Sequence, residues 1–236
     1  MSGAAWLAVG VLWALPAGAK EKAPAPVPSY FAQALVRGEG ALQVTYYWSR
    51  GPSLRVETVA GWRKYVNLVH GDTYYAYDST AAQGVAIRRS SDAIAQDENR
   101  DRPFGQELQS LLRQGAELVG EKEVAGSPCN LYRLTDRVGR REVCVTQSDL
   151  MLPVRSEVFL RATGTRMYTD YVNWLSGLPI PESFFEPPDD VEFRHFTLEE
   201  FLLQTAREGS MTPAPIMLRD LLHGTPQAAK AAAGGG

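Results

Sequence analysis

The chain has 236 residues with a formal net charge of −3 at pH 7, and 44% of its residues are hydrophobic. This length suits one sizeable domain, and the apolar content is that of a globular protein with a substantial core. The mild acidity, with both signs of charge interspersed, argues against nucleic-acid binding, which calls for a clustered basic surface, and against purely electrostatic docking on an anionic membrane.

The N-terminal segment predicts export. Residues 4–15 form an unbroken apolar run, and the small residues 16–19 follow before the charged residues 20–22. An apolar segment of this length, closed by small residues in A-x-A spacing, is typical of a cleaved signal peptide, and it is shorter than the about 20 residues of a membrane-spanning helix. We therefore expect a signal peptide over residues 1–19, and no lipid anchor at the cleavage point. An uncleaved anchor and a misplaced start codon are the alternatives.

A spacer is predicted after the signal peptide. Residues 23–29 are rich in proline, which favours an extended segment without fixed contacts. Residues 30–37 add a short stretch before the pattern of the sequence changes. We therefore place the spacer over residues 20–37 and the folded domain over residues 38–196.

Apolar and polar residues alternate from residue 41 onward, which predicts a half-buried strand over residues 41–48. One face of this strand carries Leu42, Val44, Tyr46 and Trp48. Further strands are predicted over residues 54–59, 62–69, 73–77 and 84–88. The turns between them are too short for a parallel crossover, which needs a dozen residues or more, so these strands form an antiparallel meander.

The pattern then changes to helical spacing. The polar residues 90–102 predict a mobile loop. Pro103 suits the first turn of a helix, and Gly115 suits its end. The apolar stripe of this helix, at 3.6-residue spacing, consists of Phe104, Leu108, Leu111 and Leu112.

A second meander follows. Its strands are predicted over residues 117–124, 129–135, 141–147, 153–160 and 166–175. The chain has two cysteines, Cys129 and Cys144, and an even pair in an exported protein predicts a disulfide. Because the two cysteines flank a turn at residues 136–140, a cross-strand bond between them is geometrically easy.

The C-terminal part predicts helices. Residues 184–188 are expected to close the sheet. Thr197 and Glu200 form a capping box, with Phe196 and Phe201 as its hydrophobic staple. We expect a helical extension over residues 197–223, including a shorter helix over residues 215–222, and a disordered tail over residues 224–236. The elements together predict an α+β, mainly β fold with one wide sheet of about ten strands, which must curl or split.

The motifs of common enzymes are absent: the sequence has no G-x-S-x-G, H-E-x-x-H, P-loop or Rossmann glycine pattern. His70, His195 and His223 lie far apart in sequence, and surface positions explain them best. Asp189 and Asp190 stand beside two prolines, as in a solvated turn. We therefore expect a protein that is not an enzyme, without a cofactor and without a metal site.

Five segments in order resemble the periplasmic LolA/LolB-like family of lipoprotein carriers and its outer-membrane lipoprotein-sorting relatives. Residues 46–55 are similar to a family strand that ends in Arg-Pro and soon resumes, and residues 67–77 to an Asp-Gly hairpin followed by aromatics. Residues 119–132 match the relatives' G-x-E-x-V-x-G-x-x-C-x-x-Y pattern. The remaining two segments, residues 152–155 and 183–188, resemble an LPLR strand start and a closing F-x-x-P-P.

The resemblance implies an unclosed β-barrel, which is one curved antiparallel sheet with helices covering its concave face. It also implies a periplasmic protein, soluble after cleavage, that holds the acyl chains of a lipid or lipoprotein in an apolar hollow and moves them toward the outer membrane. Each methylene buried there contributes about 0.8 kcal/mol. Partners would be an inner-membrane export complex and an outer-membrane acceptor. The alternative function on the same fold is an envelope sensor or protein-interaction module without cargo transfer, and a hydrolase is a third.

The resemblance also suggests a ligand-binding set and a lid over it. The lid is the helix with Phe104, Leu108 and Leu111, and Arg50 matches the place of a family arginine that latches the lid. Gly51 is inserted after Arg50, and the alternative for Arg50 is a solvated turn residue. The residues expected to line the hollow from the sheet are Leu42, Val44, Tyr46, Trp48, Leu54 and Val56. A register error of one residue would exchange the two faces.

Overall fold

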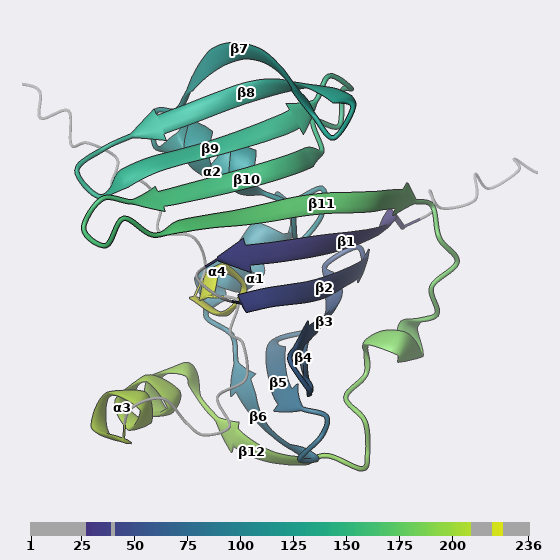
Figure 1. The fold of residues 1–236 in the computed structure, drawn as a ribbon. Coiled ribbons are helices and arrows are strands. Elements are labelled where there is room, and N and C mark those ends of the chain that lie inside the picture. Colours follow the sequence, from purple (N-terminus) through teal and green to yellow (C-terminus); the bar gives the residue numbers. More distant parts are fainter. Residues whose placement is uncertain (1–26, 39–40, 209–218, 224–236) are drawn as a thin grey trace, which may run out of the picture.

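The computed structural model describes residues 27–38, 41–208 and 219–223. Within these residues, twelve strands form one curved, unclosed sheet in the order β12-β6-β5-β4-β3-β2-β1-β11-β10-β9-β8-β7 (Figure 1). Neighbouring strands are antiparallel except for β12 and β6, which are parallel. The predicted mainly β fold with a single curved sheet is confirmed, with the correction that the sheet is mixed at one edge.

Several predictions fall on other parts of the chain. The signal peptide over residues 1–19, the proline-rich part of the spacer up to residue 26, the start of the last helix at residue 215 and the tail from residue 224 all lie outside the described residues. They stay predictions. In the described part, no helix is long and apolar enough to cross a membrane.

The first meander has the strands that the alternation predicts. They are β2 (Ala41–Arg50), β3 (Ser53–Ala60), β4 (Arg63–His70), β5 (Thr73–Asp78) and β6 (Gln83–Arg88). The turns between β2, β3, β4 and β5 each contain a glycine with positive φ, at Gly51, Gly61 and Gly71. Such tight turns fix the register of the strands that they join, and with it the face on which each side chain lies.

Strand β1 (Ser29–Gly38) corrects the prediction of a spacer over residues 20–37. It lies between β2 and β11 and pairs with both, so it joins the two meanders into one sheet. Ala32 and Ala34 face the core and are fully buried. Because the core-facing residues are small and the opposite face carries Phe31 and Leu35, the strand shows no alternation of large apolar and polar residues.

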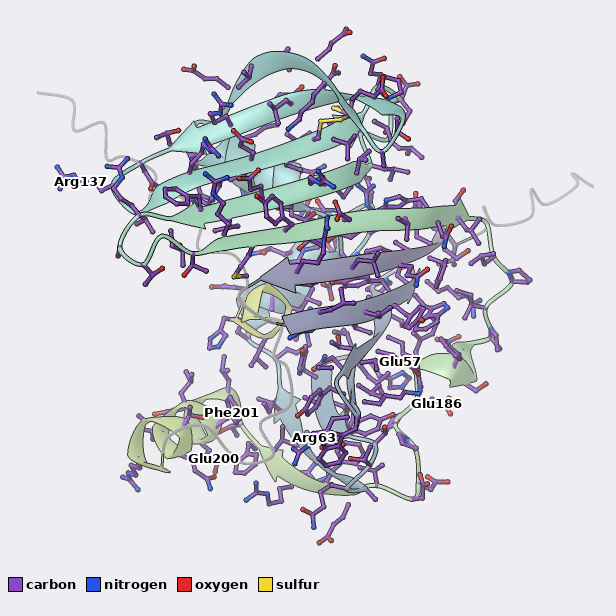
Figure 2. The ribbon with its side chains drawn as sticks, viewed as in Figure 1. Glu57, Arg63, Arg137, Glu186, Glu200 and Phe201 are labelled. Carbon is purple, nitrogen blue, oxygen red and sulfur yellow. A yellow bond between two sulfur atoms is a disulfide. The ribbon has the colours of Figure 1, made fainter. Side chains whose placement is uncertain are left out.

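The second meander also agrees with the prediction. It consists of β7 (Glu117–Val124), β8 (Ser127–Thr135), β9 (Gly139–Thr146), β10 (Pro153–Leu160) and β11 (Arg166–Ser176). The predicted disulfide between Cys129 and Cys144 joins β8 to β9, with a Cα–Cα distance of 5.5 Å (Figure 2). Cys129 pairs with Thr146 and Cys144 with Leu131, so the bond crosses the two strands diagonally.

Two helices precede β7. The polar segment predicted as a mobile loop contains α1 (Ser91–Asp97), whose cap Ser90 accepts a hydrogen bond from the backbone N–H of Ala93 at 3.1 Å. Ala93 is the helix's one buried residue, so no apolar stripe marked it. The helix predicted from Pro103 begins later, as α2 (Glu107–Arg113), because Gly105 has a φ of 66° that is incompatible with helical geometry.

The C-terminal elements are η1 (Glu182–Phe185), β12 (Glu192–Phe196), α3 (Leu198–Glu208) and α4 (Arg219–His223). Strand β12 was not expected, because the sheet was predicted to close at residues 184–188. Phe193 of β12 packs edge-on against Tyr75 and Tyr77, at centroid distances of 5.2 and 5.7 Å. A strand of five residues that adds to an existing edge is too short to show a reliable period.

The start of α3 confirms the predicted capping box (Figure 2). The Glu200 backbone N–H donates to Thr197 Oγ1 at 3.2 Å, and the Thr197 N–H donates to Glu200 Oε2 at 2.8 Å. The hydrogen bonds from the Thr197 backbone and hydroxyl lower the pKa of Glu200. The Phe196 and Phe201 rings lie 6.2 Å apart, as expected of the hydrophobic staple.

The helices α1, α2 and α4 cover the concave face of the sheet. Figure 1 shows α2 behind β8, β9 and β10, which it contacts. Side chains from β1, from β3 to β6 and from β11 meet α4 and Phe104 in one core cluster, which only the inside of a curved sheet allows. The 3-10 helix η1 contacts β3 and β4 from the convex side, so part of the sheet is covered on both faces.

Candidate functional site

The register of β2 and β3 decides which predicted residues share a face. Tyr47 pairs with Val56, whereas Tyr46 pairs with Glu57. Val56 and Leu54 belong to the core cluster on the concave face, as does Tyr47. The sheet residues proposed to line one hollow therefore divide between two faces. Those on the convex face are Leu42, Val44, Tyr46 and Trp48.

The convex residues have contacts of their own. The Trp48 ring packs against Phe31 at 5.4 Å and against Phe184 of η1 at 5.5 Å, and the Arg55 guanidinium lies 4.9 Å from the centre of the Phe184 ring. The side chain of Leu42 is exposed. The alternation in β2 was recognised correctly but its faces were exchanged, because both faces carry aromatic residues and Phe184 of η1 partly covers Trp48 on the convex one.

Arg50 lies on the same convex side. Its Nη1 is 3.7 Å from Glu182 Oε2 of η1, and the Arg50 side chain is 36% exposed to solvent, that of Glu182 73%. This placement agrees with the alternative of a solvated turn residue. A latch on α2 would require Arg50 to lie on the opposite face of the sheet.

On the concave face, four aromatic rings pack together. Phe104 stacks between Tyr47 and Trp174, with ring centroids 5.0 and 5.3 Å apart, and Tyr171 lies 5.6 Å from Trp174. Such offset stacking contributes about 0.5–1.5 kcal/mol per pair beyond the area that is buried. Phe104, which precedes α2 by three residues, is thereby anchored to β2 and β11.

Gly105 allows this anchoring. A Cβ at this position would lie 2.9 Å from Cη2 of Trp174, and the φ of 66° disfavours any other residue. Trp174 is itself fixed, because its Nε1 donates to the carbonyl oxygen of Pro153 at 2.9 Å. The chain can therefore pass directly over the indole ring and turn into α2.

Arg102 is buried behind the aromatic cluster. Its guanidinium lies 5.9 Å from the centre of the Tyr30 ring and 5.6 Å from that of Trp174, and its Nη2 donates to the Gly105 carbonyl oxygen at 3.3 Å. Among the described residues no carboxylate forms an ion pair with it. Desolvation by burial lowers the pKa of this arginine.

Helix α2 makes an apolar contact with β9 and a hydrogen bond with β11. Leu108 and Leu111 pack against Val143 and Val145. The Tyr171 hydroxyl of β11 donates a hydrogen bond to Glu107 Oε1 at the start of the helix. Burial, followed by the negative charge of Glu107, raises the pKa of Tyr171 well above its usual value, so the hydroxyl stays protonated and remains a donor.

A pocket of about 610 Å³ lies between the segment containing α2 and the concave face. This is within the roughly 300–1,000 Å³ of typical small-ligand sites. The apolar residues that line it are Tyr47, Pro103, Phe104, Leu111, Val158, Tyr171 and Leu221. Of the residues expected to bind a ligand, Phe104 and Leu111 line this pocket, while Leu108, Leu54 and Val56 are buried in the adjoining core.

The rest of the pocket lining is polar. It comes from the end of α1, from α2 and from β9 and β10, and it includes Arg100, Glu107, Arg113, Arg141 and Ser156. An apolar floor with polar groups toward the helices is the arrangement of a site for an amphiphilic molecule rather than for a purely apolar one.

Helix α4 supplies Leu221 to the pocket, and Arg89 holds this helix in place. The Arg89 Nε donates to the Leu221 carbonyl oxygen at 2.8 Å, and its two terminal nitrogens bond Asp97 at 2.7 and 2.9 Å. Ser90 Oγ donates to the carbonyl oxygen of His223 at 2.8 Å. The carbonyl groups at the end of α4 are thus satisfied by residues next to α1.

Sequence reasoning missed all of the sheet residues that line this pocket. Tyr47 belongs to the face of β2 that was taken as the outer one, and the alternation in β11 would have placed Tyr171 on a face with Met167 and Thr169. Neither pattern shows which face is concave. No sequence signal marks Leu221, since its position depends on contacts with Arg89 and Ser90. In the described part of the chain, no three acidic, histidine or cysteine side chains form a metal site.

No protein-family model and no curated protein matches the chain. Among solved structures, an uncharacterised conserved protein from Thermus thermophilus matches with a TM-score of 0.53 and 11% identity, over 71% of this chain and 90% of that one. The MucA/MucB complex of Pseudomonas aeruginosa matches with a TM-score of 0.46 and 17% identity, over 70% of this chain and 57% of that one. Mycobacterium tuberculosis lipoprotein LppX matches with a TM-score of 0.38 and 14% identity, over 66% and 89% of the two chains. At such identities, the likeness to the Thermus protein shows a shared fold alone.

Proposed function

We propose that the protein binds an acyl chain of a lipid or lipoprotein in the pocket beneath α2, and that it does so as a carrier and not as an enzyme. The observation that supports this is the pocket of about 610 Å³ with its apolar floor on the concave face. Each methylene that leaves water for such a floor contributes about 0.8 kcal/mol. A chain of a dozen methylenes therefore supplies enough free energy for specific binding after the costs of ordering it.

The small size of α2 suits it to act as a lid. The helix has seven residues, and an isolated helix of fewer than about 12–15 residues is marginal in water. Its position depends on Leu108, Leu111 and the hydrogen bond from Tyr171 to Glu107. An element with so few contacts can move aside to admit a ligand and return over it, while Phe104 stays anchored at the hinge.

The place and direction of transport are part of the same proposal. The apolar run in residues 4–15 supports export, and the resemblance to the lipoprotein carriers supports a periplasmic route toward the outer membrane. A carrier must release its ligand. We therefore expect loaded protein to transfer a fluorescent fatty acid to acceptor vesicles, whereas a sensor would retain the ligand.

Native mass spectrometry of the mature protein, purified from a Gram-negative periplasm, tests the binding. We expect an acylated species, identified by lipid extraction, at near one per chain, or uptake of one added palmitate or lysophospholipid. A clean unliganded mass that does not change with these additions would overturn the proposal.

The variant Val158→Trp tests whether the ligand binds in the pocket. Val158 lines the pocket from β10, and an indole there fills space that the acyl chain would occupy. We expect uptake to fall at least about ten-fold, the equivalent of 1.4 kcal/mol. Val59→Trp is the matched control, because it is the same substitution at an exposed position on the convex side. Equal uptake by the two variants would contradict this location.

A further inference from the structure

The pocket beneath α2 is unevenly charged. Three arginines line it, Arg100, Arg113 and Arg141, against a single carboxylate, that of Glu107. Glu107 Oε1 accepts the hydroxyl hydrogen of Tyr171, which leaves the negative charge of this carboxylate in place. The apolar floor thus faces a mouth that carries an excess of positive charge.

The three arginines come from different segments of the chain, and all of them line the pocket. Arg100 follows α1 and donates from Nη2 to Gln96 Oε1 at 3.0 Å, while its Nη1 is 4.0 Å from Asp97, a carboxylate that already bonds Arg89 with both oxygens. Arg141 of β9 donates to Gln114 Oε1 at 2.7 Å and to Asp136 at 2.5 Å. Arg100 therefore shares the negative charge of Asp97 with Arg89, whereas Arg141 has Asp136 to itself among the described residues.

Arg113 stands in the last turn of α2 and is exposed to solvent. Within residues 27–38, 41–208 and 219–223, no carboxylate oxygen lies within ion-pair distance of its guanidinium. A cation at this end of a helix is favourable, but it remains available to a ligand. The guanidinium group of Arg113 is also suited to bidentate hydrogen bonds with phosphate or carboxylate oxygens, whereas both terminal nitrogens of Arg141 already donate to Gln114 and Asp136, so that Arg141 contributes through its charge.

A further positive charge lies behind the floor. Arg102 is 1% exposed, and its Nε has no hydrogen-bond partner among the described residues. Electrostatic interactions are stronger in the low-dielectric interior than in water, so this charge adds to the potential in the pocket. The negative charges of Asp101 and Glu107 act on the Arg102 guanidinium, but neither forms an ion pair with it among the described residues.

We propose that the ligand is an anionic amphiphile, with its acyl chain on the apolar floor and its phosphate or carboxylate headgroup between Arg113, Arg141 and Arg100. This rests on the proposed function and adds the chemical class of the headgroup. The two parts of the site recognise different parts of the ligand. The apolar floor favours an acyl chain, and the arginines favour a negatively charged headgroup over a neutral or positive one.

Three detergents with one chain and different heads test this by calorimetry below micelle formation: dodecyl phosphate, dodecyl maltoside and dodecyltrimethylammonium. We expect dodecyl phosphate to bind at least about ten-fold more tightly than dodecyl maltoside, the gain from one hydrogen-bonded charge pair, and the trimethylammonium compound to bind most weakly. The difference should shrink as salt is added, because the mouth is open to solvent. Inorganic phosphate alone, which lacks the chain, should compete only weakly.

The variant Arg113→Gln tests whether the preference for dodecyl phosphate comes from the arginines that line the pocket. We expect it to weaken dodecyl phosphate binding about three- to ten-fold and to leave dodecyl maltoside unchanged, whereas Arg113→Lys should retain most of the preference. Arg88→Gln is the matched control. It removes the same positive charge, but from an exposed arginine outside the pocket.

The outcomes separate the two proposals. Equal binding of the three detergents, or equal loss in the Arg113→Gln and Arg88→Gln variants, would overturn the headgroup assignment and leave the apolar pocket standing. Competition by inorganic phosphate as strong as by dodecyl phosphate would make this a small-anion site and would also overturn it. If no detergent binds, the proposed function itself fails.

Discussion

The path of the chain over the pocket depends on one residue, Gly105. Its φ of 66° would strain any side chain, and a Cβ added there would lie only 2.9 Å from Trp174. We expect Gly105→Ala to lower the free energy of unfolding by about 1–3 kcal/mol through strained φ, and by about 1–3 kcal/mol more through overpacking. Chemical denaturation measures the loss.

Gly61→Ala is the control for the backbone part of this effect. Gly61 has nearly the same φ, 62°, but a Cβ there meets nothing within 4 Å. The difference between the two variants therefore isolates the contact with Trp174. Losses of equal size would contradict the close packing of Phe104, Gly105 and Trp174.

Glu57 provides a test of the convex side. Burial raises the pKa of Glu57, but hydrogen bonds from Lys64 and Arg55 outweigh it and hold the pKa below its ordinary 4.5. A carboxylate with a lowered folded-state pKa contributes stability above its unfolded pKa, and this contribution is lost as the pH falls through the folded value. We expect Glu57→Gln to be less stable than the parent at pH 7 and to approach it below about pH 4.

Urea denaturation of both proteins between about pH 3 and pH 7 measures this difference, with the range chosen around the ordinary carboxylate pKa. A stability gap that does not depend on pH would show that the carboxylate is not held in its charged form by Lys64 and Arg55.

At the scale of elements, the polar segment before α2 is more ordered than its composition indicates. Arg89 joins α1 to α4, with Asp97 on one side and the Leu221 carbonyl group on the other. We expect Arg89→Lys to lose the paired hydrogen bonds and to cost about 1–3 kcal/mol, because an ammonium cannot reproduce the planar fork. Hydrogen exchange should show faster exchange of the α4 amides.

The neighbouring Arg88 gives the matched control. Arg88→Lys changes an exposed side chain at the end of β6, directly before Arg89, and the exchange of the α4 amides should stay at the parent level. If Arg89→Lys leaves the α4 amides as protected as this control does, α4 is held by its apolar contacts and not by Arg89.

Elements with a repeated pattern and tight turns could be predicted from the sequence, and those that depend on tertiary contacts could not. The strands from β2 to β11 have alternation, glycine turns or both. Strand β1 lacked the signal because Ala32 and Ala34 face the core, and α1 lacked it because Ala93 alone is buried. Strand β12 depends on the exposed edge of β6, which sequence does not reveal.

For the pocket, the sequence predicted the helix side better than the sheet side. Phe104, Leu108 and Leu111 were predicted from helical spacing and are buried, although only Leu108 and Leu111 belong to α2, since Phe104 lies three residues before its start. The sheet side required the choice between two apolar faces of β2, and period-two alternation contains no information on which face is concave. The disulfide was predicted from an even pair of cysteines in a chain expected to be exported and from their placement about a turn, and it is present.

At the scale of the whole molecule, part of the sheet is covered on both faces, and the two coverings differ. The convex side holds Trp48 and Phe184 in direct contact, whereas the concave side holds a pocket beneath α2. We therefore expect the acyl chain on the concave side, where the pocket has an apolar floor. The central claim is that an acyl chain binds on the concave face, and not on the face with Trp48 that the sequence analysis predicted.

Photo-crosslinking with a fatty acid that carries a diazirine on its chain, followed by peptide mass spectrometry, tests this claim most directly. We expect adducts on the peptides that contain Tyr47, Leu111 and Val158, and their loss when unlabelled palmitate is in excess. Because Tyr47 and Trp48 are adjacent, fragment spectra must assign the adduct to the residue. Adducts confined to Trp48 and the η1 segment would contradict a site on the concave face.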